Sequence, residues 1–228
     1  MSVDRDGLGR VLAVALGLCL ICSVVVSFAA VTLKPAQQAN KTRDLKRNIL
    51  LAAGLFDPKD SVEEQFKQIE TRVIDLDTGI FLDDVDPIFF DQRVAAKDPK
   101  QSAKIPVDRD IAKLARRENQ SLVYLVRKME GSLDKIILPI RGYGLWSTLY
   151  GFMALEADGN TVASLGFYEH AETPGLGGEV DNPRWKALWP GKQIYRGGEL
   201  AIEVLKGPVS VNSERAAWQV DGLSGATI

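Results

Sequence analysis

Apolar residues dominate the start of the chain, and the pattern there is that of a membrane helix. From Val11 to Leu33, 23 residues (VLAVALGLCLICSVVVSFAAVTL) carry no charged side chain. At about 1.5 Å per residue, such a helix extends about 35 Å, which is enough to cross the hydrocarbon core of a bilayer. A cleavable signal peptide is the alternative, but its apolar core is normally only about 7 to 15 residues long. We therefore predict an uncleaved transmembrane helix over residues 11–33, preceded by a tail of residues 1–10.

The charges on either side of this segment do not decide its orientation. Arg5 and Arg10 precede it, whereas the basic residues that follow it are Lys34, Lys41, Arg43, Lys46 and Arg47. Counted by the positive-inside rule, this excess would place the rest of the chain in the cytoplasm. The rule weakens for long translocated domains, so both orientations stay open.

Residues 34–120 predict a linker followed by a helical region. The proline and polar residues of 34–40 (KPAQQAN) are typical of a linker. Helical spacing over residues 45–55 predicts a helix that ends near Gly54. Ser61 with Glu64 fits a capping box. A second amphipathic helix is predicted from four apolar residues at helical spacing, Val62, Phe66, Ile69 and Val73. Residues 83–117 are charged and poorly periodic, and they predict loops with short helices.

Beyond residue 120 the pattern changes to that of strands. Short apolar or alternating runs, separated by Gly, Asn, Asp and Pro, occupy residues 121–127, 136–140, 149–155, 162–168 and 201–205. Asp158-Gly159-Asn160 predicts a hairpin turn between two of these runs. The expected product is an antiparallel sheet packed on helices. The fold class is thus α+β, with one N-terminal transmembrane helix followed by a domain whose binding region spans residues 121–228.

Composition excludes some classes of function. The chain has 28 basic and 30 acidic residues and a formal net charge of −2, with no basic stretch interleaved with aromatics, so nucleic acid is not an expected partner. Both cysteines, Cys19 and Cys22, lie inside the apolar N-terminal segment. The rest of the chain therefore has no thiol with which to form a disulfide or ligate an iron–sulfur cluster.

Three glycine-marked segments in the second half are candidates for binding. They cover residues 141–148 (RGYGLWST), 170–178 (HAETPGLGG) and 221–227 (DGLSGAT). None matches a dinucleotide-binding fingerprint or a P-loop, so a standard NAD site is not expected. Glycine lets backbone N–H groups approach an anion, and Ser224-Gly225-Ala226-Thr227 would suit a phosphate. Short runs of these residues are also common in plain turns, so this pattern alone leaves both readings open.

Together, these segments resemble the flavin domain of a known family. Ser224 to Thr227 reads S-G-A-T, the flavinylation motif of the NqrC family, which belongs to the sodium-translocating NADH:quinone reductase, and of the related G-type component of the Rnf complex. Residues 144–148 (GLWST) and 172–177 (ETPGLG) precede it in the order and spacing of these families. The continuation Asn182-Pro183-x-Trp185 is more similar to the NADH:quinone reductase component. The resemblance covers the chain from the apolar segment to its end.

The resemblance implies a redox role within a larger complex. FMN would be joined through its phosphate to the hydroxyl of Thr227 by a separate flavin transferase. The other partners would be the remaining subunits of a six-subunit NADH:ubiquinone reductase, in which electrons pass from NADH toward ubiquinone and sodium is exported. The location would be the bacterial cell inner membrane, spanned once, with the soluble domain in the periplasm. No catalytic residue and no metal ligand is implied on this chain.

The residue types in these segments suit a flavin. An isoalloxazine ring needs a flat apolar face and a few polar groups at its edge. Leu145, Trp146 and Leu176 are candidates for the apolar face. Thr148, Glu172 and Thr173 are candidates for the polar edge. The phosphate would lie beside Ser224, Gly225 and Ala226, with Thr227 as the point of attachment. His170, the only histidine, is expected to be structural or to face solvent.

The sequence ends at Ile228, directly after this threonine, whereas the families that it resembles continue with further Ser and Thr and a helix. We therefore expect that the C-terminal end is truncated. Two alternatives remain: a G-type component of an Rnf complex, and a membrane-anchored scaffold without flavin or redox activity. The missing tail favours the scaffold.

Overall fold

The computed structural model describes residues 7–210 and 212–223, which fall into two units divided after Asp44. The first unit is formed by the N-terminal part of helix α1 (Leu8–Ala53). Mean hydropathy reaches 2.8 in the most apolar window of this helix, and none of that window is buried. Helix α1 is therefore long and apolar enough to cross a membrane, as the sequence predicted.

The expected linker over residues 34–40 is wrong, because α1 continues through it with Pro35 inside the helix. A proline removes one backbone hydrogen bond and normally weakens a helix interior. The residues that follow it, AQQA, include some of the strongest helix formers. These residues favour continuation of the helix after the proline.

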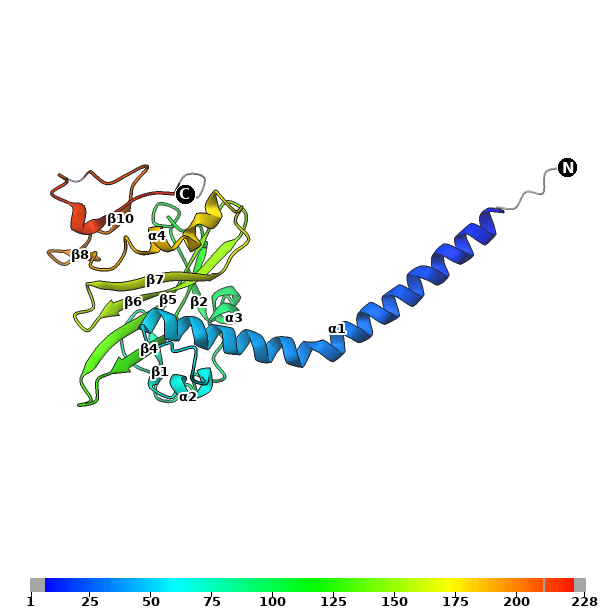
Figure 1. Ribbon diagram of the computed structural model, residues 1–228, viewed down its shortest axis with the longest axis horizontal. Coiled ribbons are helices and arrows are strands. Elements are labelled where there is room, and N and C mark those ends of the chain that lie inside the picture. The colour runs from blue at the N-terminus through cyan, green and yellow to red at the C-terminus, as the bar shows by residue number, and fades with distance from the viewer. Residues whose placement is uncertain (1–6, 211, 224–228) are drawn as a thin grey trace. The chain divides into compact units, whose positions relative to one another are not determined.

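The second unit is built on a five-stranded antiparallel sheet (Figure 1). Its strands, in spatial order, are β1 (Ile69–Asp75), β4 (Gln120–Arg127), β5 (Leu133–Tyr143), β6 (Thr148–Glu156) and β7 (Val162–Glu169). Four of these strands were predicted. The predicted hairpin turn between β6 and β7 is also confirmed, because Asp158 Oδ1 accepts hydrogen bonds of 2.8 Å from the Asn160 and Thr161 amides.

The prediction of a long second helix is wrong. Helix α2 covers only Val62–Phe66, with Ser61 Oγ accepting a hydrogen bond from the Glu64 amide, and β1 follows. Ile69 and Val73 are both buried. A spacing of four residues places two side chains on one face of a strand as well as of a helix. The pairing of β1 with β4, in which Val73 lies opposite Leu122, accounts for the strand.

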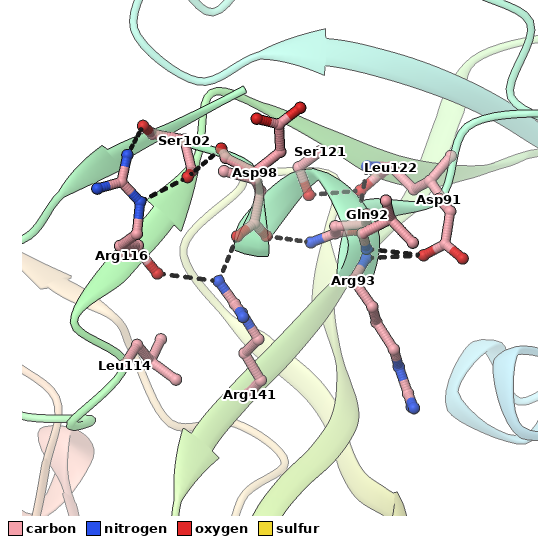
Figure 2. Close-up of polar contacts among 12 residues, drawn as sticks. Asp91, Gln92, Arg93, Asp98, Ser102, Leu114, Arg116, Ser121, Leu122 and Arg141 are labelled. Carbon is pink, nitrogen blue, oxygen red and sulfur yellow. Dashed lines mark hydrogen bonds and ion pairs between the residues drawn. The ribbon is translucent and has the colours of Figure 1, made fainter. Parts of the chain in front are cut away.

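Between β1 and β4 the chain forms short elements, as expected for this charged region. They are α3 (Gln92–Lys97), β2 (Ser102–Lys104) and β3 (Arg116–Glu118). The buried carboxylate of Glu118 accepts hydrogen bonds from Gln92 Nε2 and from Arg141 Nη2. Figure 2 shows these contacts beside the hydrogen bonds of Arg116 to Ser102. This network ties the insertion to β5.

The sheet has a hydrophobic core on each face, because alternate side chains point to opposite sides. The end of α1 and α2 cover one face, where Leu50 and Ile137 are fully buried. Ser164 Oγ also donates a 2.8 Å hydrogen bond to the carbonyl of Ala52 there. The C-terminal part of the chain covers the other face, where Trp185 and Val220 are buried (Figure 1).

This C-terminal part consists of short elements. They are η1 (Gly177–Asp181), α4 (Pro183–Lys186), β8 (Tyr195–Arg196), β9 (Glu199–Leu200), β10 (Glu203–Val204), η2 (Ala216–Trp218) and β11 (Gln219–Val220). The strand expected over residues 201–205 is thus reduced to β10. It pairs in parallel with β11 and does not join the main sheet. This pairing places residues 204–207 beside the last described residues, 220–223.

Candidate functional site

A cavity of about 740 Å³ lies between the second face of the sheet and the C-terminal segment. Its walls are mainly apolar, and they come from strands β5 to β7, from η1 and α4, and from two short C-terminal stretches. The apolar lining residues are Ile140, Leu149, Phe167, Val180, Trp185, Val204, Leu205 and Leu223. Volumes of about 300 to 1,000 Å³ with mostly apolar walls are typical of sites for small organic ligands.

The three glycine-marked segments meet at this cavity. Each supplies lining residues, namely Gly144 from the first, Glu172 and Gly177 from the second, and Gly222 from the third. The segments are far apart in sequence, so the sheet and its connections bring them together. Their convergence on one cavity supports a common binding function.

Glu172 links the first two segments. Its carboxylate is buried, with only 6% of the residue exposed, and it accepts hydrogen bonds from three consecutive backbone amides. The donors are the amides of Leu145 (3.1 Å), Trp146 (3.1 Å) and Ser147 (3.0 Å), together with the Ser147 hydroxyl (3.2 Å). Successive N–H groups that converge on one anion form a nest. Burial alone would raise the pKa of Glu172, but these hydrogen bonds outweigh it and hold the pKa below its ordinary value.

The glycines of these segments are required by close packing. A Cβ atom on Gly144 would lie 2.5 Å from Glu172 Oε1, and one on Gly177 would lie 2.9 Å from Oε2. A Cβ atom on Gly222 would lie only 1.9 Å from the carbonyl oxygen of Leu205. Any side chain at these positions would therefore displace either the carboxylate or the neighbouring backbone.

The predicted apolar residues lie outside the lining. Leu145 is 60% exposed, Trp146 67% and Leu176 48%, and their backbones adjoin the lining residues Gly144 and Gly177. Thr148 begins β6 opposite Tyr143. The Thr173 side chain is exposed. Among the described residues, neither threonine lines the cavity.

The predicted attachment segment lies outside the described residues. This concerns Ser224, Gly225, Ala226 and Thr227. The residue before it, Leu223, lines the cavity. The chain therefore enters this segment from the cavity wall.

Two basic side chains also line the cavity. Arg141 is held by Glu118 and by the carbonyl of Arg116. Lys206 is exposed, and no residue within 7–210 or 212–223 accepts a hydrogen bond from its ammonium group. It lies beside Gly222, whose amide donates to the carbonyl of Gly207 (3.3 Å). Lys206 is thus a cation next to the start of the attachment segment.

His170 has a structural environment, as expected. Its Nε2 lies 2.8 Å from Asp181 Oδ2, and Lys186 Nζ lies 2.9 Å from the other oxygen of the same carboxylate. Its Nδ1 accepts a hydrogen bond from the Glu172 amide (3.3 Å). The imidazole therefore fixes the segment that precedes η1, and it is not among the residues that line the cavity.

Several lining residues were not predicted from the sequence. Phe167, Leu149 and Ile140 follow the ordinary alternation of half-buried strands, so nothing distinguishes them from core residues before the fold is known. Residues 204–207 offered only a weak strand pattern. The one usable signal was alternation itself, which places Leu149 and Gly151 on one face of β6.

A family model for the FMN-binding domain matches residues 144–228, and FMN fits what these residues build. The cavity has the size and apolar lining for a flat ring, with the rings of Phe167 and Trp185 in its wall. Trp185 is held in place because its Nε1 donates a 2.8 Å hydrogen bond to the carbonyl of Asp221. Lys206 provides positive charge for a phosphate near the segment where attachment is expected.

Relatives cover nearly the whole chain. The C-type subunit of the Na(+)-translocating NADH-quinone reductase of Pseudomonas aeruginosa is 52% identical over 99% of this chain and 88% of its own length. The protein of the same name from Vibrio vulnificus is 48% identical over 99% of this chain and 87% of its own. These relatives favour the reductase component over the Rnf-type alternative.

Solved structures agree with the sequence relatives. The crystal structure of Shewanella oneidensis NqrC is 38% identical and matches with a TM-score of 0.73, covering 82% of this chain and 86% of that one. The structure of the corresponding reductase protein from Parabacteroides distasonis is 25% identical, with a TM-score of 0.65 and a coverage of 85% of each chain. Fold, cavity and sequence thus lead to one assignment: the chain belongs to the NqrC family, the C-type subunits of the Na(+)-translocating NADH-quinone reductase.

Proposed function

We propose that this chain is the membrane-anchored subunit of a Na(+)-translocating NADH-quinone reductase that carries electrons by means of FMN bound in the cavity described above. The observation that carries this proposal is the convergence of the three motif segments on one cavity. When bound, FMN supplies reversible redox chemistry, which the chain's own side chains lack. No thiol or metal cluster is needed for this role.

The cofactor is attached covalently, through a phosphoester between FMN and the hydroxyl of Thr227. Four residues separate Thr227 from Leu223, and an extended chain of four residues reaches about 13 Å. Thr227 can therefore place a phosphate at the cavity mouth, where Lys206 is available to pair with it. A threonine hydroxyl is a weak nucleophile without an adjacent base, so a separate flavin transferase makes the bond, using FAD and magnesium.

The chain's residues hold the ring and limit its exposure to water. Phe167, Trp185 and the other apolar lining residues contact the ring, while Leu145, Trp146 and Leu176 border it from the rim. Thr148 and Thr173 provide polar groups at the ring edge. Ser224, Gly225 and Ala226 position the phosphate. The apolar lining excludes water and leaves the rim as the surface through which electrons exchange with partner centres.

The assembly is a complex of six subunits in the bacterial inner membrane, with the second unit of this chain in the periplasm. The apolar helix α1 supports membrane anchoring. Relatives named as subunits of the reductase support the presence of other subunits. The complex as a whole passes electrons from NADH toward ubiquinone and exports sodium, and this chain contributes one redox step.

Mass spectrometry tests the attachment directly. The full chain is produced in a membrane that contains the flavin transferase, and the intact mass and the C-terminal peptide are measured. We expect an FMN-phosphoryl adduct on the peptide that contains Thr227. Thr227→Ala should abolish the adduct, whereas Thr227→Ser should retain it, because serine keeps a hydroxyl.

Ser224→Ala is the matched control, since it removes a hydroxyl from the same segment but leaves the acceptor. An unmodified C-terminal peptide in the wild-type chain would contradict covalent attachment. An adduct that persists in Thr227→Ala would place the bond at another residue. Flavin absorbance that washes out under denaturing conditions would indicate a cofactor bound without a covalent bond.

A further inference from the structure

We propose that Glu172 is a positioning residue for the flavin, whose carboxylate clamps residues 145–147 and so holds Leu145 and Trp146 at the cavity rim. This inference rests on the proposed function, because the rim matters only if the cavity binds FMN. It revises the expectation that Glu172 contacts the ring edge. Its role is exerted through the loop that it holds.

The loop between β5 and β6 depends on this carboxylate. Its base is closed by the Gly144 amide, which donates to the Ser147 carbonyl (2.7 Å). The amides of Leu145, Trp146 and Ser147 all donate to Glu172. Since the Leu145 and Trp146 side chains are mostly exposed, packing contributes little to holding them. The hydrogen bonds to Glu172 are therefore the main restraint on this loop.

The surroundings of Glu172 are built around a carboxylate. Gly144 and Gly177 leave room for one oxygen each, because a Cβ atom on either would collide with it. Ser147 adds a second link, since its hydroxyl donates to Glu172 and accepts from the Ala171 amide (2.8 Å). The two motif segments are thus fastened together at two points, one on the carboxylate and one on the hydroxyl.

The clamp also explains how an anion can line a flavin cavity. Both oxygens of Glu172 accept hydrogen bonds from the loop, so the negative charge is stabilised within the protein and needs no group from a ligand. A glutamine at this position keeps the size but has one acceptor oxygen, and its NH₂ group would face donor N–H groups. Glu172→Gln therefore removes the clamp with little change in volume.

Amide hydrogen exchange on the full chain in detergent tests the clamp without any cofactor. In protein made without the transferase, Glu172→Gln should speed exchange at amides 145–147 at least about tenfold, because each loses a charge-assisted hydrogen bond. Glu156→Gln is the matched control, since none of the described hydrogen bonds uses the Glu156 carboxylate, and its exchange at 145–147 should equal that of wild type. Exchange that is unchanged in Glu172→Gln would overturn the proposal.

The flavin is then examined in protein made with the transferase. The mass adduct should form to the same extent in Glu172→Gln, because the attachment segment is separate from the loop. The visible circular dichroism of the flavin should fall by about half or more, and its midpoint potential should shift, as the ring loses its fixed neighbours. Faster exchange at 145–147 with unchanged dichroism and potential would overturn the positioning role. A missing adduct in the wild-type chain would refute covalent attachment instead, and the exchange result would stand by itself.

Discussion

Gly222 is the position where one added methyl group should disturb the site most. In Gly222→Ala the new Cβ atom would lie 1.9 Å from the Leu205 carbonyl oxygen, whereas carbon and oxygen atoms normally approach to about 3.3 Å. The two strands must therefore separate by about 1.4 Å. That movement strains two hydrogen bonds, from the Gly222 amide to the Gly207 carbonyl and from the Leu205 amide to the Val220 carbonyl. Adding their loss to the cost of overpacking gives a destabilisation of about 2 to 4 kcal/mol.

Urea unfolding of the full chain, followed by tryptophan fluorescence, measures this cost, because Trp185 and Trp189 pack against Val220. Gly166→Ala is the control: a Cβ atom there meets nothing within 4 Å, and we expect a change of under about 1 kcal/mol. The fraction of chain that carries FMN should also fall in Gly222→Ala, since the displaced strand leads into the attachment segment. An unfolding midpoint and a flavin content equal to those of Gly166→Ala would refute this reasoning.

Three further predictions concern the core, the pH dependence and the charge at the cavity. Leu50→Ala should lower the free energy of unfolding by about 2 to 5 kcal/mol, because Leu50 is fully buried, whereas Leu51→Ala, at a half-exposed neighbour, should change it by under about 0.5 kcal/mol in the same urea titration. The lowered pKa of Glu172 means that its stabilising contribution is present above the unfolded pKa of about 4.3 and is lost as pH falls through the folded pKa; the stability gap between wild type and Glu172→Gln should therefore narrow below about pH 4 in unfolding curves. Lys206→Gln should slow flavin attachment by purified transferase about two- to fivefold, as expected for one exposed charge contact, and Lys128→Gln should not; equal rates would exclude a phosphate contact at Lys206.

Much of the sheet could be predicted because its signals are local. Strands β4 to β7 alternate in polarity, and Asp158 with Gly159 marks the turn between two of them. The errors arose where a local pattern fits two structures. Val73 lies four residues after Ile69, which suits a helix or a strand, and only pairing with β4 decides between them. In the same way, Pro35 suggested a break that its helix-forming neighbours override.

The candidate site was predictable only in part. Motif order identified the three segments, and the structure brings Gly144, Glu172 and Gly222 to one cavity. The hydrogen bonds from the 145–147 amides to Glu172 depend on a contact across more than twenty residues, which no local pattern reveals. Phe167 has the same alternating pattern as core residues, so its place in the cavity wall required the fold. The roles assigned to Thr148, Thr173 and Thr227 stay predictions.

The position of Leu223 in the cavity wall affects how tightly the cavity must bind its cofactor. A ring attached at Thr227 cannot diffuse away, and a short flexible tether corresponds to an effective concentration in the millimolar range. An intrinsic dissociation constant near that value already keeps the ring in place for much of the time. The tether therefore removes the need for a dense set of polar contacts. A largely apolar wall with a few basic groups is then sufficient, and part of the ring can remain open to electron exchange.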